Sequence, residues 1–165
     1  LVNNAGMTRR GSLEVLSEDD WQRVIDLNLT AMWRVSKYVV MGMLRRKSGK
    51  IINIASLMSS ASRPGTGAYA ASKGGVVALT KAMTVDWAAS NIQVNAIAPG
   101  YIVTDLNRDL KEDPKFDDWV RTRTPAGRWG ELSDLVGLAV YLASSASDFV
   151  TGQTIYVDGG WTANL

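Results

Sequence analysis

Apolar residues recur every three or four positions in three stretches of the chain, which is the spacing of an amphipathic helix. The first stretch follows Ser17, which together with Asp20 has the S-x-x-[DE] form of a capping box. This spacing predicts one long helix from about Glu18 to Arg45. The apolar stripe that we expect to face the core consists of Trp21, Val24, Ile25, Met32, Val35 and Val39.

The other elements are shorter or less regular. A second helix is expected from about Gly67 to Ser90, with small residues on one side that suit close packing, and a third from Leu132 to Ala143. β-rich runs at 50–55, 91–97 and 154–157 predict strands, and Leu1-Val2 reads as the end of a buried strand. Residues 101–130 are charged and are expected to be irregular, with breaks at Pro114 and Pro125.

Strands and helices therefore alternate along the chain. This alternation predicts an α/β fold in which a doubly wound parallel sheet lies between two helical layers, in a three-layer α/β/α arrangement. There is no internal repeat and no linker, so we expect residues 1–165 to form a single domain.

Composition then excludes several classes of function. With 18 basic and 16 acidic residues the net charge is +2, which is too small to favour nucleic acid as a partner. No apolar run is long enough for a membrane span, so a cytoplasmic protein is expected. The chain has no Cys and no His, which excludes thiolate nucleophiles, disulfides, Ser-His-Asp hydrolysis and His-ligated zinc; we expect no metal.

Tyr69 and Lys73 form a Y-x-x-x-K pattern at the start of the second predicted helix, on one helical face and one turn apart. A neighbouring ammonium and a helix N-terminus both favour a phenolate, so the pair is a candidate tuned proton donor. By itself the spacing is more typical of a surface pair. Ser56 ends a predicted buried strand, however, and Asn28 lies in the apolar stripe of the first helix, where an amide needs partners.

Three predicted strand ends carry polar or glycine-containing signatures: Asn3-Asn4-Ala5-Gly6, Ser56, and Pro99-Gly100 with Ile102 and Thr104. The order of motifs along essentially the whole chain resembles that of the classical short-chain dehydrogenase/reductase family. These motifs are N-N-A-G, a helix Asn, I-N-I-A-S, Y-A-A-S-K, N-A-I-A-P-G-Y-I-x-T and V-D-G-G. The resemblance implies a Rossmann-like fold and an NAD(P)-dependent oxidoreductase that transfers hydride between nicotinamide and a secondary alcohol or ketone.

The resemblance also implies roles for individual residues. Tyr69 would be the general acid/base, and Ser56 would donate a hydrogen bond to the substrate carbonyl. Lys73 would lower the Tyr69 pKa and hold the nicotinamide ribose. Asn28 would anchor a proton-relay water. The cofactor, NAD or NADP, would be bound by Asn3, Asn4, Ala5, Gly6, Tyr69, Lys73, Pro99, Gly100, Ile102 and Thr104.

The family's glycine-rich turn, which would precede Asn3, is not in these residues, nor is the residue that selects NAD or NADP. We therefore expect an N-terminally truncated chain that holds the C-terminal two-thirds of the fold. If the polypeptide begins at Leu1, we expect weak or no dinucleotide binding.

Within the family, the stretches 112–116, 124–130 and 157–161 look most like gluconate 5-dehydrogenases and their deoxy-ketogluconate relatives. A sugar acid would need a guanidinium for its carboxylate, for which Arg10 and Arg63 are candidates, although both also fit solvated surface positions. The excursion at about 101–130 resembles the substrate lid of the family.

Two other interpretations remain open. One is a 3-oxoacyl-carrier-protein reductase, and the other is an inactive fragment that acts only as an oligomerisation module. The resemblance implies a homotetramer.

Overall fold

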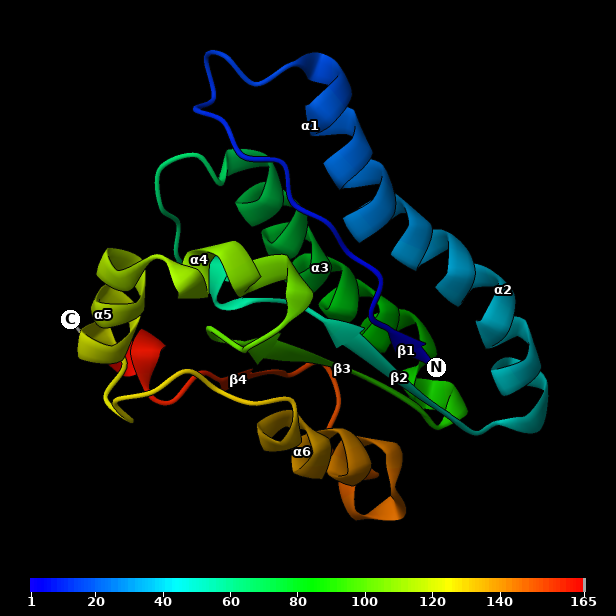
Figure 1. Cartoon of the computed structure of the whole chain (residues 1–165). Helices are drawn as coiled ribbons and strands as arrows, with labels where there is room; N and C mark the ends of the chain where they lie inside the picture. Colours follow the sequence, from blue (N-terminus) through cyan, green and yellow to red (C-terminus); the bar gives the residue numbers. More distant parts are fainter. Residues whose placement is uncertain (165) are drawn as a thin grey trace.

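The computed structural model describes residues 1–164 and shows a four-stranded, fully parallel sheet (Figure 1). Its strands are β1 (Val2–Asn3), β2 (Gly49–Ile54), β3 (Ile92–Pro99) and β4 (Thr154–Val157), in that spatial order. The register of the sheet pairs Asn3 with Asn53, Ile54 with Ile97, and Pro99 with Val157. The carboxyl ends of neighbouring strands therefore meet at one edge of the sheet. The predicted strands are confirmed.

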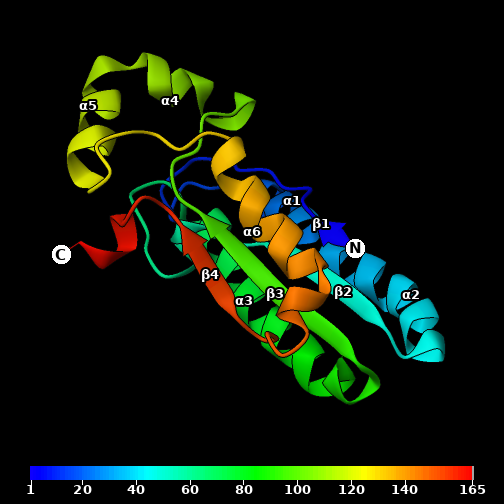
Figure 2. The ribbon, with the colours of Figure 1, turned by 90° about the horizontal axis from the view of Figure 1, so that it is seen from below.

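Helices cover both faces of the sheet (Figure 2). One layer contains α1 (Glu18–Ile25), a π-helical turn (Asp26–Thr30), α2 (Ala31–Arg46) and α3 (Gly67–Trp87); α6 (Ser133–Ala143) lies on the opposite face. Short 3-10 turns lie at Leu57–Ser59, Ala88–Ser90, Asp105–Asn107, Ser145–Ser147 and Trp161–Ala163. The three-layer α/β/α prediction is confirmed.

The core lies on both sides of β3, which is buried from Ile92 to Ala98. Successive residues of a strand point to opposite faces. Ala96 and Ala98 pack with Met32 and Val76 of the helical layer, whereas Ile97 packs with Leu142 of α6. Both faces of β3 are therefore covered, and the strand also buries two polar side chains, Gln93 and Asn95.

β1 differs from the prediction in its burial. We expected the end of a buried strand at Leu1-Val2, but Val2 is exposed because β1 lies at the edge of the described sheet and pairs only with β2. Asn3, by contrast, is buried.

The first helix forms as predicted, but only part of its predicted apolar stripe is buried. Val24 and Met32 are buried as expected, whereas Trp21 is exposed. The buried line runs through Val24, Asn28, Met32, Ser36 and Val40 at intervals of four residues, and Val35 and Val39, which follow the π-helical turn, point outward. The cause is the π-helical turn, in which i→i+5 bonding makes one turn wider and rotates the face that follows.

The small residues of α3 allow close approach, as expected. A Cβ placed on Gly75 would lie 2.7 Å from a methyl carbon of Leu29, and one on Gly67 would clash with Leu13. The missing side chains thus let α3 approach Leu29 of the Asp26–Thr30 turn at Gly75 and Leu13 at Gly67.

The segment 101–130 was expected to be irregular, and this prediction was wrong. It contains α4 (Arg108–Glu112) and α5 (Pro114–Arg123). Pro114 begins α5 rather than interrupting a helix, because its fixed φ suits the first helical position and the Asp113 side chain accepts from Lys115 N at 3.0 Å. Both helices lie beyond the carboxyl ends of β3 and β4 (Figure 2).

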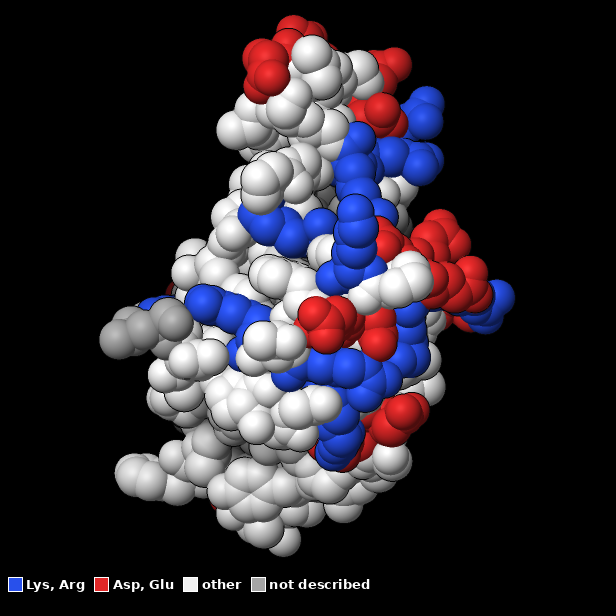
Figure 3. Space-filling view, turned by 60° about the vertical axis from the view of Figure 1, so that its left-hand side comes forward, with Lys and Arg blue, Asp and Glu red and all other residues white. Residues whose placement is uncertain are grey.

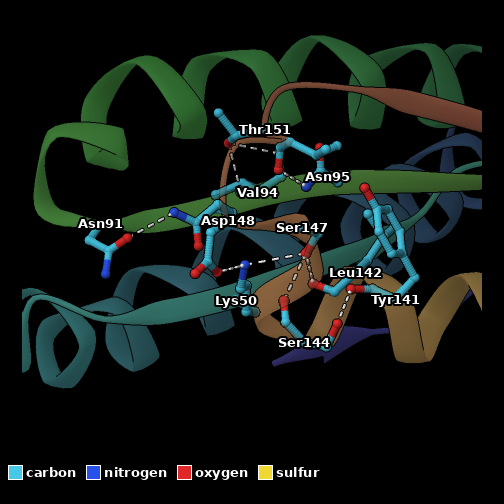
Figure 4. Close-up of polar contacts among 12 residues, drawn as sticks. Lys50, Asn91, Val94, Asn95, Tyr141, Leu142, Ser144, Ser147, Asp148 and Thr151 are labelled. Atoms are coloured by element: carbon cyan, nitrogen blue, oxygen red, sulfur yellow. Dashed lines mark hydrogen bonds and ion pairs between the residues drawn. The ribbon is translucent and has the colours of Figure 1, made fainter.

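At the opposite end of the sheet, a group of polar contacts joins β2 and β3 to the connection between α6 and β4 (Figure 4). Lys50 Nζ donates to Asp148 Oδ1 at 2.7 Å and to Ser147 Oγ at 3.2 Å, and Asn95 Nδ2 donates to Val150 O at 2.7 Å. These contacts fix the return of the chain into β4 and hence the order of the last two strands.

Charged side chains are interspersed on the surface shown in Figure 3, where basic and acidic groups lie side by side. In the α4–α5 segment, Asp117 pairs with both Lys111 and Arg121, at 3.3 and 2.7 Å. Among residues 1–164, none of the helices combines the length and the apolar composition that a membrane span requires.

Candidate active site

The carboxyl ends of β1, β2 and β3 bring three segments of the predicted site together. The turn after Asn3, the residues around Ser56, and the Pro99-Gly100 segment each follow one of these strands. The first turns of α3 bring Tyr69 and Lys73 to the same edge. This is the position at which open parallel sheets bind ligands.

Ser56 is held by the turn that it caps. Its Oγ accepts from Met58 N at 3.1 Å, while Ser59 Oγ accepts from Ser56 N at 3.2 Å and donates to Lys73 O at 3.0 Å. The capping bond uses an acceptor lone pair of Ser56, so its own O–H remains available as a donor. The local structure of this turn thus orients the hydroxyl.

Tyr69 and Lys73 lie on one face of α3, with Lys73 Nζ 5.7 Å from the centroid of the Tyr69 ring. Burial lowers the pKa of Lys73 to about 8, and its ammonium donates to Ile54 O at 2.6 Å. Burial raises the pKa of the Tyr69 phenol, against the opposing effect of a hydrogen bond with Ser56. The lowered phenol pKa expected from the sequence is therefore wrong for this structure, because burial outweighs the groups that favour the phenolate.

Asn28 lies in the π-helical turn and is completely buried. Its Oδ1 accepts from Met7 N at 2.8 Å, and its Nδ2 donates to Met7 O at 2.9 Å and to Ser72 Oγ at 3.0 Å. The amide that the sequence pattern singled out therefore has partners, and it joins the segment after β1 to α3.

Two cavities adjoin at Ser56 and Tyr69. The small cavity, of about 70 Å³, is lined by Thr8, Arg10, Ser56, Leu57, Met58, Arg63, Thr66, Tyr69, Gly100, Tyr101, Leu106 and Asn107. The large cavity, of about 270 Å³, is lined by Asn4, Gly6, Ile54, Ala55, Ser56, Tyr69, Lys73, Pro99, Gly100, Ile102, Thr104, Leu106, Asn107, Leu132 and Leu135. Both linings contain cations and no carboxylate, so both cavities favour anionic ligands.

Most of the residues predicted to bind the cofactor line the large cavity. Those that do are Asn4, Gly6, Tyr69, Lys73, Pro99, Gly100, Ile102 and Thr104, whereas Asn3 and Ala5 do not. The Asn3 amide instead donates to Ser36 Oγ and Asn53 Oδ1 at 2.9 and 2.8 Å, within the protein. A buried Asn at a strand end cannot be assigned to a cavity or to the interior from sequence alone.

Comparisons with known proteins agree with this arrangement. A family model described as "Enoyl-(Acyl carrier protein) reductase" matches residues 1–162. The chain is 47% identical to the gluconate 5-dehydrogenase of Gluconobacter oxydans, covering 100% of this chain and 64% of the relative. It is 50% identical to the 5-keto-D-gluconate 5-reductase of Escherichia coli K12, covering 97% and 63%.

The chain belongs to the short-chain dehydrogenase/reductase family. Among solved structures, a gluconate 5-dehydrogenase from Burkholderia cenocepacia in complex with NADP and tartrate superposes with a TM-score of 0.99 at 51% identity, covering 100% of this chain and 65% of that one. The chain thus spans slightly less than two thirds of the length of these short-chain dehydrogenases.

Arg10 and Arg63 both line the small cavity. These are the two arginines that the sequence predicted to bind the substrate. Arg10 is exposed, whereas Arg63 is partly buried and its guanidinium lies 4.9 Å from the centroid of the Phe116 ring. The sequence interpretation did not assign Tyr101 or Asn107, which also line this cavity. Tyr101 could have been included, because it directly follows Gly100 in the strand-end motif; Asn107 carries no such signal.

Within the described residues, no group of three or more His, Cys, Asp or Glu side chains is arranged to hold a metal ion. The polar groups available to a short-chain dehydrogenase at this site are hydroxyls, amides and cations. Hydroxyls and cations of this kind can donate hydrogen bonds and transfer protons.

We expect Asn28→Ala to lower the free energy of unfolding by about 3 kcal/mol, because it removes a completely buried amide and leaves both backbone groups of the partly buried Met7 without this partner. Urea denaturation measures the change. Gln22→Ala is the matched control: this amide is exposed on α1 and bonds only to Asp26, so its removal should cost less than about 0.5 kcal/mol. Equal losses in the two variants would show that the buried amide has no special role.

Proposed function

We propose that the protein is an NAD(P)-dependent oxidoreductase that transfers hydride between nicotinamide and a secondary alcohol or ketone, with gluconate and 5-ketogluconate, or a related sugar acid, as the substrate pair. The observation that supports this most strongly is the position of Ser56 and Tyr69 on the boundary between the two cavities. A carbonyl in the small cavity would meet both hydroxyls and also face the large cavity.

The large cavity suits the nicotinamide and ribose end of a dinucleotide. The Lys73 ammonium lines it and uses one of its three N–H donors on Ile54 O, which leaves donors for the hydroxyls of a ribose. A Cβ placed on Gly6 would lie 3.6 Å from Lys73 Nζ, so the backbone of the turn after β1 runs beside this ammonium. Asn4, Gly6, Ile102 and Thr104 would contact the bound nucleotide, which supplies or accepts the hydride.

The protein supplies the remaining chemistry. In the reducing direction, Ser56 O–H donates to the carbonyl oxygen and stabilises the negative charge that develops there as the carbon accepts hydride. Tyr69 delivers its phenolic proton to the same oxygen, and its raised pKa keeps it protonated at neutral pH. Lys73, whose Nζ lies 5.7 Å from the centroid of the Tyr69 ring, would return a proton to the phenolate. Asn28 holds the segment after β1 that runs beside the Lys73 ammonium.

The sugar-acid assignment rests on the small cavity and on the relatives. The cavity is polar and contains two guanidinium groups, which suits a short hydroxylated anion better than a long acyl chain. The Gluconobacter and Escherichia relatives are named for gluconate and 5-ketogluconate, and the Burkholderia protein was solved with NADP. These relatives favour NADP as the cofactor of this protein.

The experiment is a comparison of substrates. We expect NADPH to be oxidised in the presence of 5-ketogluconate and much more slowly with a 3-oxoacyl thioester. Because the chain spans about two thirds of its relatives, it should be assayed both alone and fused behind the glycine-rich first segment of a family member. Turnover of the thioester but not of 5-ketogluconate by the active form would select the acyl reductase. Binding of neither NADPH nor NADH by either form would favour a role in oligomerisation alone.

We expect Arg10→Ala to raise the KM for 5-ketogluconate about tenfold, because a charge-assisted hydrogen bond to the carboxylate is lost. The KM for a neutral ketone should change less than twofold. Arg9→Ala provides the control, since Arg9 is exposed, pairs with Asp20 at 3.3 Å and does not line the small cavity. Equal effects of Arg10→Ala on charged and neutral substrates would remove Arg10 from substrate recognition.

Three further features belong to the same proposal. Residues 101–130, with α4 and α5, would form a lid over the substrate within one domain of residues 1–165. A homotetramer would cover the apolar residues that α2 and α6 expose, among them Trp33, Val35, Val136 and Val140. The location would be cytoplasmic, where NADP and sugar acids are available.

A further inference from the structure

Tyr101 is fixed at the floor of the small cavity by an aromatic cluster. It lies two residues after the end of β3 and is only 8% exposed. The cluster is defined by the rings in edge contact with it, at centroid distances of 5.5 to 6.2 Å: Phe116, Trp119, Trp129 and Trp161. Edge-to-face packing of this kind leaves the Tyr101 ring a single position.

The hydroxyl of Tyr101 is buried and has no hydrogen-bond partner among the described residues. Buried hydroxyl groups are normally paired, because an unpaired one loses the hydrogen bonds that it makes with water. Burial raises the pKa of this phenol, while Arg63 and Arg10 act in the opposite direction. The group is therefore a neutral O–H donor beside two cations at neutral pH.

Arg63 shows the same feature beside Tyr101, close enough that each side chain shifts the pKa of the other. Its Nε is buried and also lacks a partner, and burial lowers the pKa of its guanidinium. The plane of that guanidinium lies against Phe116, which belongs to the aromatic cluster around Tyr101. One rigid group of rings thus positions two unpaired donors that line the same cavity.

We propose that Tyr101 is a specificity-determining residue: its hydroxyl and the Arg63 guanidinium together bind the carboxylate of the substrate, with the exposed Arg10 as a third donor. This deepens the proposed function and rests on it. A carboxylate oxygen accepts more than one hydrogen bond, so a fork of N–H groups and one phenol can share it. Ser56 and Tyr69 line the same cavity, so one sugar acid would place its ketone at these hydroxyls and its carboxylate at Tyr101 and Arg63.

Tyr101→Phe tests this directly, because it removes the hydroxyl and keeps the ring that fills the aromatic cluster. We expect the KM for 5-ketogluconate to rise about tenfold with kcat little changed. The KM for L-sorbose, the same ketone with a hydroxymethyl group in place of the carboxylate, should stay within about twofold. Tyr38→Phe, at an exposed position on α2, is the control and should change neither value.

A second measurement separates this proposal from the proposed function. Calorimetry should show that Tyr101→Phe weakens gluconate binding about tenfold and leaves sorbitol binding unaltered. Equal effects of Tyr101→Phe on the charged and the neutral ligand, or no effect on either, would overturn the carboxylate role. If the unchanged protein binds gluconate through Tyr101 but reduces no ketone with NADPH or NADH, the proposed function fails while the anion site stands.

Discussion

Replacing Tyr69 by phenylalanine is expected to lower kcat for reduction of 5-ketogluconate about 1000-fold, with little change in the KM for NADPH. The variant keeps the ring packed on α3 and loses only the proton that the carbonyl oxygen must receive, and a positioned general acid contributes about 10² to 10⁴ in rate. Stopped-flow measurement of NADPH consumption in a single turnover would report the chemical step itself.

The oxidising direction provides an internal check on the same residue. Burial raises the pKa of Tyr69, so only a small fraction of the phenol is ionised at neutral pH and the rate of gluconate oxidation should increase as the solution becomes more alkaline. Reduction uses the protonated phenol and should lack this rise. Tyr38→Phe should retain both behaviours, and a Tyr69→Phe enzyme with more than a tenth of the wild-type kcat would remove Tyr69 from the role of proton donor.

Replacing Ser56 by alanine is expected to lower kcat about 100-fold, because one hydrogen-bond donor to the developing oxyanion is lost. The same change deletes the bond from Met58 N to Ser56 Oγ and should lower the free energy of unfolding by about 1 kcal/mol. The kinetic loss must therefore be separated from a structural one.

Ser59→Ala makes this separation. Ser59 forms the other half of the capping box and bonds to Lys73 O, but it does not line either cavity. It should cost a similar amount of stability and leave kcat within about threefold. If Ser59→Ala proved as inactive as Ser56→Ala, the effect of Ser56 would be explained by the turn rather than by contact with the substrate.

Periodicity predicted the elements of this fold well, because most of them bury a face with an ordinary repeat. β3 is rich in apolar residues because both of its faces are covered, although it also buries Gln93 and Asn95. The strand ends carried polar motifs, since the sheet opens to ligands there. Ser56, Tyr69 and Lys73 could be grouped on this basis before the structure was known.

The remaining features depend on tertiary contacts that a one-dimensional pattern does not contain. The widened turn at Asn28 is stabilised by bonds to Met7, twenty-one residues away, and it turns Val35 and Val39 outward. The helix at Pro114 could have been recognised from the Asp113 cap. The unpaired state of the Tyr101 hydroxyl could not have been predicted from the sequence, because it depends on four rings from other parts of the chain.

The central claim is that Ser56 and Tyr69 hold a ketone against the cavity that binds the nicotinamide. Isotope transfer tests it most directly: 5-ketogluconate is reduced with NADPH that carries deuterium at both C4 positions, and the sugar-acid product is examined by NMR. The account predicts deuterium on carbon 5 of the product, none at any other carbon, and loss of this product in Tyr69→Phe. Product that forms at an undiminished rate in Tyr69→Phe, or that carries no deuterium at carbon 5, would contradict it.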